Sequence, residues 1–143
     1  MTVYRERLWA PPLLYLATAL VIPAALLVFL PISPVAGVVV AAALYLGVLV
    51  MLWVLAPVVE VTDTEFRAGR ARLPRAAVGA VEGFEGAAAT TQRGPKLDAR
   101  AWILFRGYVS GVVRVEVADP QDPTPYWLVS VRHPDRVVAA LAE

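Results

Sequence analysis

The fold of this chain is decided by the stretch from Leu8 to Val59, which reads LWAPPLLYLATALVIPAALLVFLPISPVAGVVVAAALYLGVLVMLWVLAPVV. It contains no Asp, Glu, Lys, Arg or His. A charged residue at the centre of a bilayer costs about 2.5–3.5 kcal/mol on insertion scales, and a spanning helix needs about 20 mostly apolar residues. The stretch is therefore long enough for two membrane spans.

A proline-rich break, Leu30-Pro31-Ile32-Ser33-Pro34, divides this stretch near its middle. We expect one span over about residues 10–30 and a second over about residues 35–56, each reaching roughly 30 Å as a helix. Pro23 should kink the first span, because proline removes a helical hydrogen bond. The short connection makes the two helices antiparallel. Residues 1–57 are thus predicted to form a transmembrane helical hairpin.

Positive charge lies at the two outer ends of this hairpin. Two arginines precede the first span and four follow the second within about 20 residues; they are Arg5, Arg7, Arg67, Arg70, Arg72 and Arg75. Because positive residues favour the cytoplasmic side, both termini of a multi-pass protein of the cell (inner) membrane are predicted to be cytoplasmic. A secretory signal peptide ending at Ala17-Thr18-Ala19 is the alternative, but another long apolar run follows that triplet.

The remaining residues carry balanced charge. Of 13 Lys or Arg and 12 Asp or Glu, only Arg5, Glu6 and Arg7 precede Val59, which leaves eleven of each sign after it. General nucleic-acid binding needs a surplus of cations, so we expect no nucleic-acid partner. The chain has no cysteine, which excludes disulfides, thiolate metal sites and cysteine nucleophiles. The single histidine, His133, excludes a multi-histidine metal site.

Residues 58–143 are predicted to form a small cytoplasmic antiparallel β domain, which makes the chain an α+β membrane protein. Apolar and polar residues alternate from Val59 to Leu73, with turns at Asp63-Thr64 and Gly69-Arg70. We expect further strands over about residues 77–84, 101–105, 112–118 and 126–131.

A short terminal helix is expected to pack on this sheet. Pro134 suits a first helical turn, and Val137, Val138 and Leu141 give one apolar face. The segment 86–96 has neither a strong period nor apolar anchors, so it is expected to be a mobile loop.

About seven short strands closed by a helix resemble the pleckstrin-homology-like (PH-like) domains found beside two-helix membrane hairpins in bacteria; a five-stranded OB-like barrel is the alternative. Longer runs are more specific, namely Tyr4-Arg5-Glu6-Arg7-Leu8, Gly94-Pro95-x-Leu97-Asp98-x-Arg100-Ala101 and Asp122-Pro123-Thr124-Pro125-Tyr126-Trp127-Leu128-Val129-Ser130. They resemble an actinobacterial family of small two-span membrane proteins, DUF3093, catalogued only as a domain of unknown function. The resemblance implies a two-span membrane protein of GC-rich bacteria and supplies no activity, substrate or catalytic residue.

The arginines after the second span are candidate contacts for lipid head groups: Arg67, Arg70, Arg72 and Arg75. Each cation near an anionic leaflet contributes about 1 kcal/mol to binding. Arg70 and Arg72 alternate with Ala71 and Leu73, so they should share one face of a strand. An ordinary solvated face that merely satisfies the orientation rule is the alternative.

Two other sets of residues are candidates for packing or docking. Gly37 with Ala41, and Ala43 with Gly47, have the small-residue spacing that lets helices approach closely. They predict either packing on the first span or a face for a partner or second copy. Tyr126 is a candidate partner contact, because alternation turns its neighbour Trp127 toward the core.

Catalytic residues are not evident. Ser130, His133 and Asp135 are the residue types of a triad, but they lack a nucleophile elbow and an oxyanion hole. An enzyme would need Ser130, His133, Asp98 or Asp119 to converge in a cleft. Asp119 and Asp122 form the nearest carboxylate pair, and turn formation explains them more simply than a metal does.

We therefore expect a protein that is not an enzyme and needs no cofactor or metal. The first hypothesis is a membrane-anchored cytoplasmic adaptor or small accessory subunit that docks a protein partner. The alternative is a PH-like module that senses anionic lipids or another ligand. The expected partners are membrane lipids and either a protein partner or further copies of the chain. Transport is disfavoured because no Asp, Glu, Lys, Arg or His lies inside either span.

Overall fold

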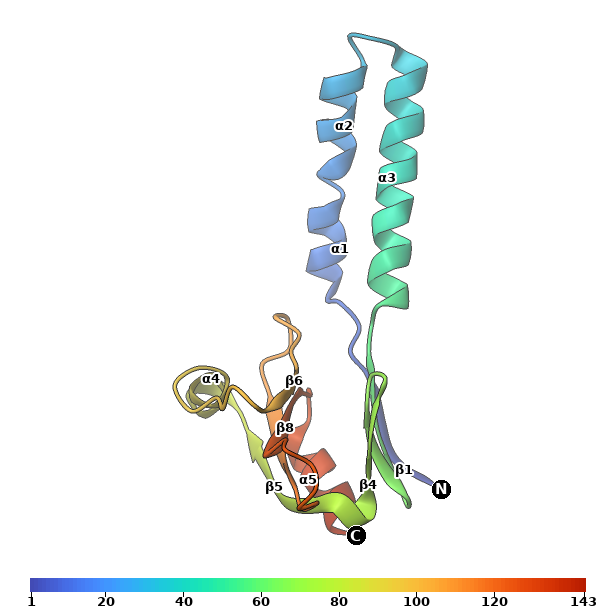
Figure 1. Ribbon diagram of the computed structural model, residues 1–143. Coiled ribbons are helices and arrows are strands. Elements are labelled where there is room, and N and C mark those ends of the chain that lie inside the picture. The colour runs from blue at the N-terminus through green and yellow to red at the C-terminus, as the bar shows by residue number, and fades with distance from the viewer. The chain divides into compact units, whose positions relative to one another are not determined.

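The computed structural model describes residues 1–143, which form two compact units. One unit is Trp9–Ala56, and the other combines Met1–Leu8 with Pro57–Glu143. Figure 1 shows the helices of the first unit and the strands of the second. The expected division into residues 1–57 and 58–143 is therefore wrong at its start, because the first eight residues belong to the β domain.

The unit Trp9–Ala56 is a helical hairpin. Its first arm contains α1 (Pro12–Thr18) and α2 (Val21–Phe29), and its second arm is α3 (Pro34–Val54). The arms have mean hydropathies of 2.2 and 2.6, and both are long and apolar enough to cross a membrane. Ser33 caps α3 by accepting a hydrogen bond from the Ala36 N–H at 3.4 Å.

The first arm is interrupted at Ala19 and Leu20, one turn before Pro23. Pro23 has no N–H for the Ala19 carbonyl, and its ring crowds that carbonyl. The chain tightens there, since the Ala19 and Leu20 N–H groups donate to carbonyls only three residues earlier, at 3.1 and 3.2 Å. The kink predicted at Pro23 is thus a short break between two helices.

The two pairs of small residues in α3 have different surroundings. Gly37 and Ala41 are buried, and a Cβ added to Gly37 would lie 3.5 Å from the Leu26 side chain of α2. Ala43 and Gly47 are exposed, with no atom within 4 Å of a Cβ built on Gly47. The first pair therefore packs the hairpin together, and the second lies on its outer surface.

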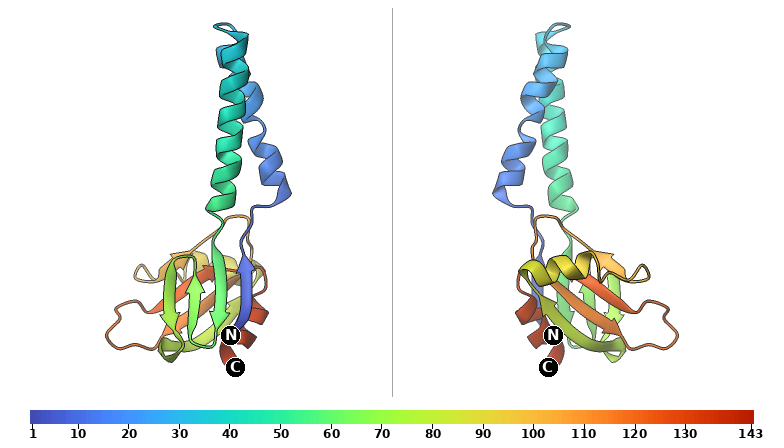
Figure 2. Two further views of the ribbon diagram at one scale, coloured as in Figure 1. Left: turned by 90° about the vertical axis from the view of Figure 1, so that its right-hand side faces the viewer. Right: turned by 90° about the vertical axis from the view of Figure 1, so that its left-hand side faces the viewer.

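The first sheet of the β domain consists of β1 (Thr2–Arg7), β2 (Val58–Thr62), β3 (Glu65–Ala68) and β4 (Ala71–Pro74). These strands are antiparallel and adjacent in the order β1-β2-β3-β4, as the left view of Figure 2 shows. The pairing of β1 with β2 continues to the end of both strands, where the Leu8 N–H donates to the Pro57 carbonyl at 2.9 Å. The sequence does not predict β1, because its charges match the basic flank of a membrane span.

The second sheet follows the short 3-10 helix η1 (Arg75–Ala77). It contains β5 (Val78–Phe84), β6 (Trp102–Leu104), β7 (Val112–Val117) and β8 (Tyr126–Ser130), in the order β5-β7-β8-β6. Each of the four predicted strands is present. However, β6 pairs with β8 in parallel, so the domain is mixed rather than antiparallel throughout. The crossover that parallel pairing requires is supplied by residues 105–125, which include β7.

The two sheets enclose one apolar core. Phe66 of the first sheet is fully buried, and its ring centre lies 6.0 Å from that of Trp127 in the second. The predicted terminal helix is α5 (Pro134–Ala142), which contributes Val137 and Leu141 to this core. It begins tightly against the second sheet, because a Cβ on Gly83 would lie 2.9 Å from the Pro134 Cβ.

The segment that was expected to be a mobile loop contains α4 (Gly86–Arg93), so that prediction is wrong. Its alanines favour a helix, and Gly86 enters it with a φ of +54°. Ala89 is fully buried and forms a second apolar cluster with Val112, Tyr126 and Leu128. Because this cluster covers the outer side of the second sheet, β8 is buried on both faces.

The placement of β1 can be tested with Leu8, which directly follows this strand and is fully buried in the core. Leu8→Ala should lower the free energy of unfolding of the β domain by about 2–5 kcal/mol, because it leaves a cavity. Arg5→Ala, at an exposed position of β1, should change it by less than about 0.5 kcal/mol. Thermal unfolding of the full-length protein in mild detergent, followed by near-ultraviolet circular dichroism, measures both. Equal effects would contradict the placement of β1.

Candidate functional sites

The outer face of the first sheet carries a row of charged residues, one from each strand. The register places Arg5 opposite Glu60, Glu60 opposite Arg67, and Arg67 opposite Arg72. The residues on either side of this row along β2 and β3, such as Val59 and Phe66, point into the core. Because neighbouring strands lie about 4.8 Å apart, three arginines and one glutamate share a narrow band of surface.

Arg67 is neutralised within this band. Its guanidinium lies 2.6 Å from a Glu65 carboxylate oxygen and 3.7 Å from a Glu60 oxygen. Glu60 is held in turn by the Thr2 hydroxyl, which donates to it at 3.1 Å. These contacts relieve the repulsion that a directly opposed pair of arginines, Arg67 and Arg72, would otherwise suffer. Arg67 is therefore part of a structural ion-pair group.

Arg70 lies at the end of the sheet where the chain connects to the hairpin. It occupies the β3–β4 turn beside Gly69, whose φ of +60° suits glycine. The Gly69 N–H donates to the Val58 carbonyl at 2.8 Å, and a Cβ on Gly69 would lie 3.8 Å from that of Pro57. Arg70 is thus close in the fold to the point where the chain leaves the β domain.

Arg75 lies at the opposite end of the sheet and has a structural role. Its guanidinium donates to the carbonyl of Ala140, in the last turn of α5, at 2.9 Å. Its N–H donates to the Thr64 carbonyl at 2.9 Å. The structure therefore separates the four candidate arginines: Arg75 and Arg67 serve the fold, whereas Arg70 and Arg72, together with Arg5, are exposed and form no ion pair.

Tyr126 is not an exposed partner contact, so that prediction is wrong. Its side chain is buried, and its ring lies 4.4 Å from the Arg114 guanidinium carbon. Its hydroxyl accepts a hydrogen bond from the Asp98 N–H at 2.8 Å and donates to the Lys96 carbonyl at 3.3 Å. Alternation along β8 failed as a guide because the 85–105 segment covers the second face of that sheet.

The loop that Tyr126 anchors contains the ion pair Asp98–Arg100. Arg100 donates to Asp98 from its backbone N–H at 2.8 Å and from its guanidinium at 2.9 Å. These hydrogen bonds, with the guanidinium charge, lower the pKa of Asp98 to about 2.

A second shifted group lies on β1. Burial and a hydrogen bond to Glu6 at 2.9 Å raise the pKa of Tyr4 above its ordinary value. Asp98 and Tyr4 therefore both stabilise the local structure through hydrogen bonds to nearby residues.

The candidate catalytic residues each have separate partners and are not brought together in one cleft. Ser130 is fully buried, and its hydroxyl accepts the Arg106 N–H at 3.1 Å. Asp119 accepts the Gln121 N–H at 2.9 Å, as an aspartate does in a turn. Asp98 is held by Arg100, and His133 is exposed at the start of α5. No group of three or more His, Cys, Asp or Glu side chains is placed to hold a metal ion.

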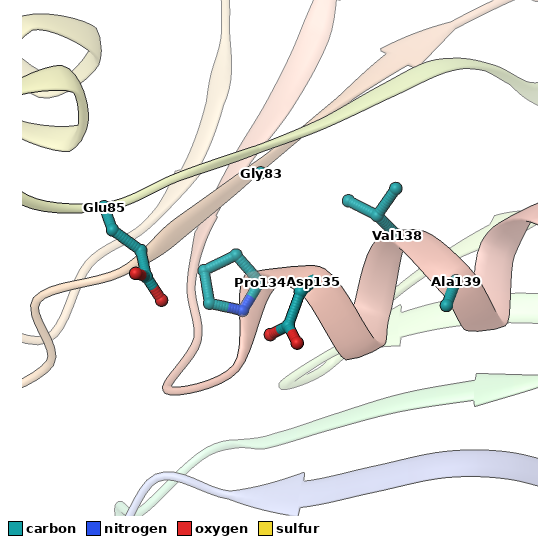
Figure 3. A pocket seen from close by; sticks show the side chains of 6 residues that line it. All are labelled: Gly83, Glu85, Pro134, Asp135, Val138 and Ala139. Atoms are coloured by element: carbon teal, nitrogen blue, oxygen red, sulfur yellow. The ribbon is translucent and has the colours of Figure 1, made fainter.

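An open groove between β5 and α5 is a concave feature that the sequence did not predict. It has a volume of about 740 Å³ and is lined by Gly83, Glu85, Pro134, Asp135, Val138 and Ala139. Figure 3 shows the carboxylates of Glu85 and Asp135 on either side of Pro134. The groove depends on how α5 docks against β5, and this long-range contact has no local sequence signal.

A family model described as "Protein of unknown function (DUF3093)" matches residues 3–141. The chain belongs to the DUF3093 family. The match begins within β1 and ends within α5, so the DUF3093 family unit includes the hairpin and both parts of the β domain. No curated protein and no solved structure matches the chain.

The structural role of Tyr126 can be tested by removing its hydroxyl. Tyr126→Phe should lower the free energy of unfolding by about 0.5–1.5 kcal/mol, because the Asp98 N–H and Lys96 carbonyl lose a partner. Thermal unfolding in mild detergent measures the change, with Tyr45→Phe in α3 as the control. Unchanged stability of the Tyr126 variant would favour a surface role for this residue instead.

Proposed function

We propose that this protein is a membrane-anchored adaptor or small accessory subunit that docks a protein partner at the inner surface of the cell membrane, without catalysing a reaction. The observation that carries the proposal is the pairing of β1 with β2 on either side of the hairpin. Because this pairing ends at the Leu8–Pro57 hydrogen bond, the β domain is attached to both arms rather than to one flexible linker. Such a double attachment suits a protein that holds a partner at a membrane.

The proposed orientation places both termini in the cytoplasm. The hairpin arms are apolar and free of charge, and Arg5 and Arg7 precede the first arm whereas further arginines follow the second. This distribution matches the positive-inside tendency. Trp9 and Trp53, whose ring centres lie 6.1 Å apart, are at the same end of the hairpin, as expected for aromatic residues at one membrane interface.

We further assign the β domain to the PH-like class. The four-stranded meander β1–β4, the antiparallel strands β5, β7 and β8, and the closing helix α5 agree with the resemblance to PH-like domains, which are closed by a terminal helix. The short strand β6 is an addition at one edge. Two four-stranded sheets and a terminal helix do not fit a five-stranded OB-like barrel.

The adaptor proposal can be tested by isolating the tagged protein from native membranes in mild detergent. Native gel electrophoresis and mass spectrometry should find it with a second protein at constant stoichiometry. The variant Gly47→Leu serves as a control, because a side chain there has open space. The added leucine side chain should disrupt a homo-oligomer in which Ala43 and Gly47 form the contact between copies. It should leave a complex with another protein intact. Recovery of the wild-type chain only as a monomer would refute the proposal.

A second function is favoured by Arg5, Arg70 and Arg72, which are exposed without ion pairs. Arg70 also lies at the end of the sheet where the chain enters the hairpin. A surface of unpaired cations beside a membrane attachment point is suited to anionic lipid head groups. In this function the β domain would rest on the leaflet and respond to its charge.

The lipid function predicts that anionic lipid stabilises the β domain. The full-length protein in nanodiscs containing anionic lipid should unfold at a higher temperature than in neutral nanodiscs, and salt should reduce the difference. Arg70→Ala with Arg72→Ala should remove about 2 kcal/mol of this stabilisation. Lys96→Ala, another exposed cation, is the control and should retain it. Identical behaviour of the two variants would exclude the head-group contact.

A further inference from the structure

β5 is an unusual edge strand. With seven residues it is the longest strand of the domain, yet it pairs only with β7. The register with β7 is irregular between Val78 and Val81 and regular from Val81 to Phe84, and these last four residues form no backbone hydrogen bond on the side away from β7. Long edge strands with free backbone groups are normally shortened, charged or covered, because they attract other strands.

The other sheet edges are protected. β4 has four residues and ends at Pro74, which cannot donate a hydrogen bond. β6 has only three residues. β1 is tied to the start of α5, because Glu6 accepts the Arg132 N–H at 3.2 Å. β5 is therefore the edge left available.

The groove beside β5 adds side-chain contacts to this free edge. Gly83 contributes no side chain to the wall, whereas Pro134, Val138 and Ala139 supply an apolar floor from α5 (Figure 3). The only charged residues in the lining are Glu85 and Asp135. A ligand in this groove would meet free backbone groups along one side, apolar carbon beneath it and negative charge at one end.

We infer that the β5–α5 groove binds an extended, basic peptide segment of a partner protein by adding it as a strand to β5. This inference rests on the proposed adaptor function and names the chemistry of the partner. Strand addition combines main-chain hydrogen bonds, which give affinity, with pockets for alternate side chains, which give specificity. Alternate residues of the segment place apolar groups on Val138 and Ala139 and a lysine or arginine between Glu85 and Asp135.

A second copy of the chain is a poorer occupant. Pairing of β5 with β5 of another molecule would bring the exposed Glu82 and Glu85 of both copies together. Like charges across an interface are unfavourable. The same argument excludes acidic peptides. Positive charge on the incoming segment complements Glu85 and Asp135, so a basic segment matches the groove in charge as well as in shape.

The inference is tested by panning a phage library of short random peptides on the full-length protein in neutral-lipid nanodiscs, with empty nanodiscs as a background. Neutral lipid prevents basic peptides from adhering to the bilayer itself. The enriched peptides should carry Lys or Arg alternating with apolar residues. Hydrogen exchange should slow over residues 78–85 when such a peptide is added, because strand addition protects the edge amides.

Charge reversal provides the matched control. Glu85→Lys with Asp135→Lys should weaken binding of the enriched peptides by at least about tenfold. Glu143→Lys, which changes an exposed acid outside this groove, should leave it within about twofold. Failure to enrich peptides, enrichment of acidic ones, or equal binding to both variants would overturn the inference.

Isolation of the charge-reversal variant from native membranes distinguishes failure of this inference from failure of the adaptor function. If the Glu85→Lys, Asp135→Lys chain still assembles with its partner in native membranes as the wild type does, the groove is not the docking site and the adaptor function stands. If the wild-type chain has no partner at all, the adaptor function itself fails. Loss of the complex in this variant alone supports both.

Discussion

The structure depends on the backbone pairing of β1 with β2. These strands come from the two sides of a stretch of about fifty residues, and closing a flexible loop of that length carries an entropic cost. Here the loop is itself an antiparallel helical hairpin, which brings its two ends to the same side. The β domain in turn needs the pairing, because Leu8 is fully buried in its core. The hairpin thus supplies a condition that the β domain requires.

This pairing also determines the surroundings of the arginines. Adjacent residues of a strand face opposite sides, and the register from β1 to β4 aligns Arg5, Glu60, Arg67 and Arg72 in one row. Glu60 and Glu65 neutralise the arginine nearest to them and leave Arg72 unpaired. Arg75, only three residues farther along, bonds to α5 instead. Proximity in sequence therefore does not make these four residues one surface.

The sequence predicted the features that depend on local pattern. Two apolar helical arms long enough to cross a membrane, the strands over residues 58–131 and the terminal helix follow from runs, alternation and prolines, and all of them are present. β1 was missed because its residues, most of them polar or charged, pair with a strand more than fifty positions away. The role of Tyr126 was missed because alternation cannot reveal that α4 covers the second face of β8. The β5–α5 groove could not be predicted from local pattern either, because its two walls are about fifty residues apart in the sequence.

The short connections have a consequence for any docking on the β domain. Only three residues separate Leu8 from the first residue of α1, and only two separate the end of α3 from Pro57. At about 3.5 Å per residue, the longer connection spans roughly 14 Å when fully extended. The β domain is thus joined to each arm of the hairpin by a short connection. In the proposed adaptor function, a membrane-bound partner would meet the β domain at a high effective concentration, so weak binding of one exposed segment would suffice for assembly. A shallow, open groove with a free strand edge is suited to such weak binding.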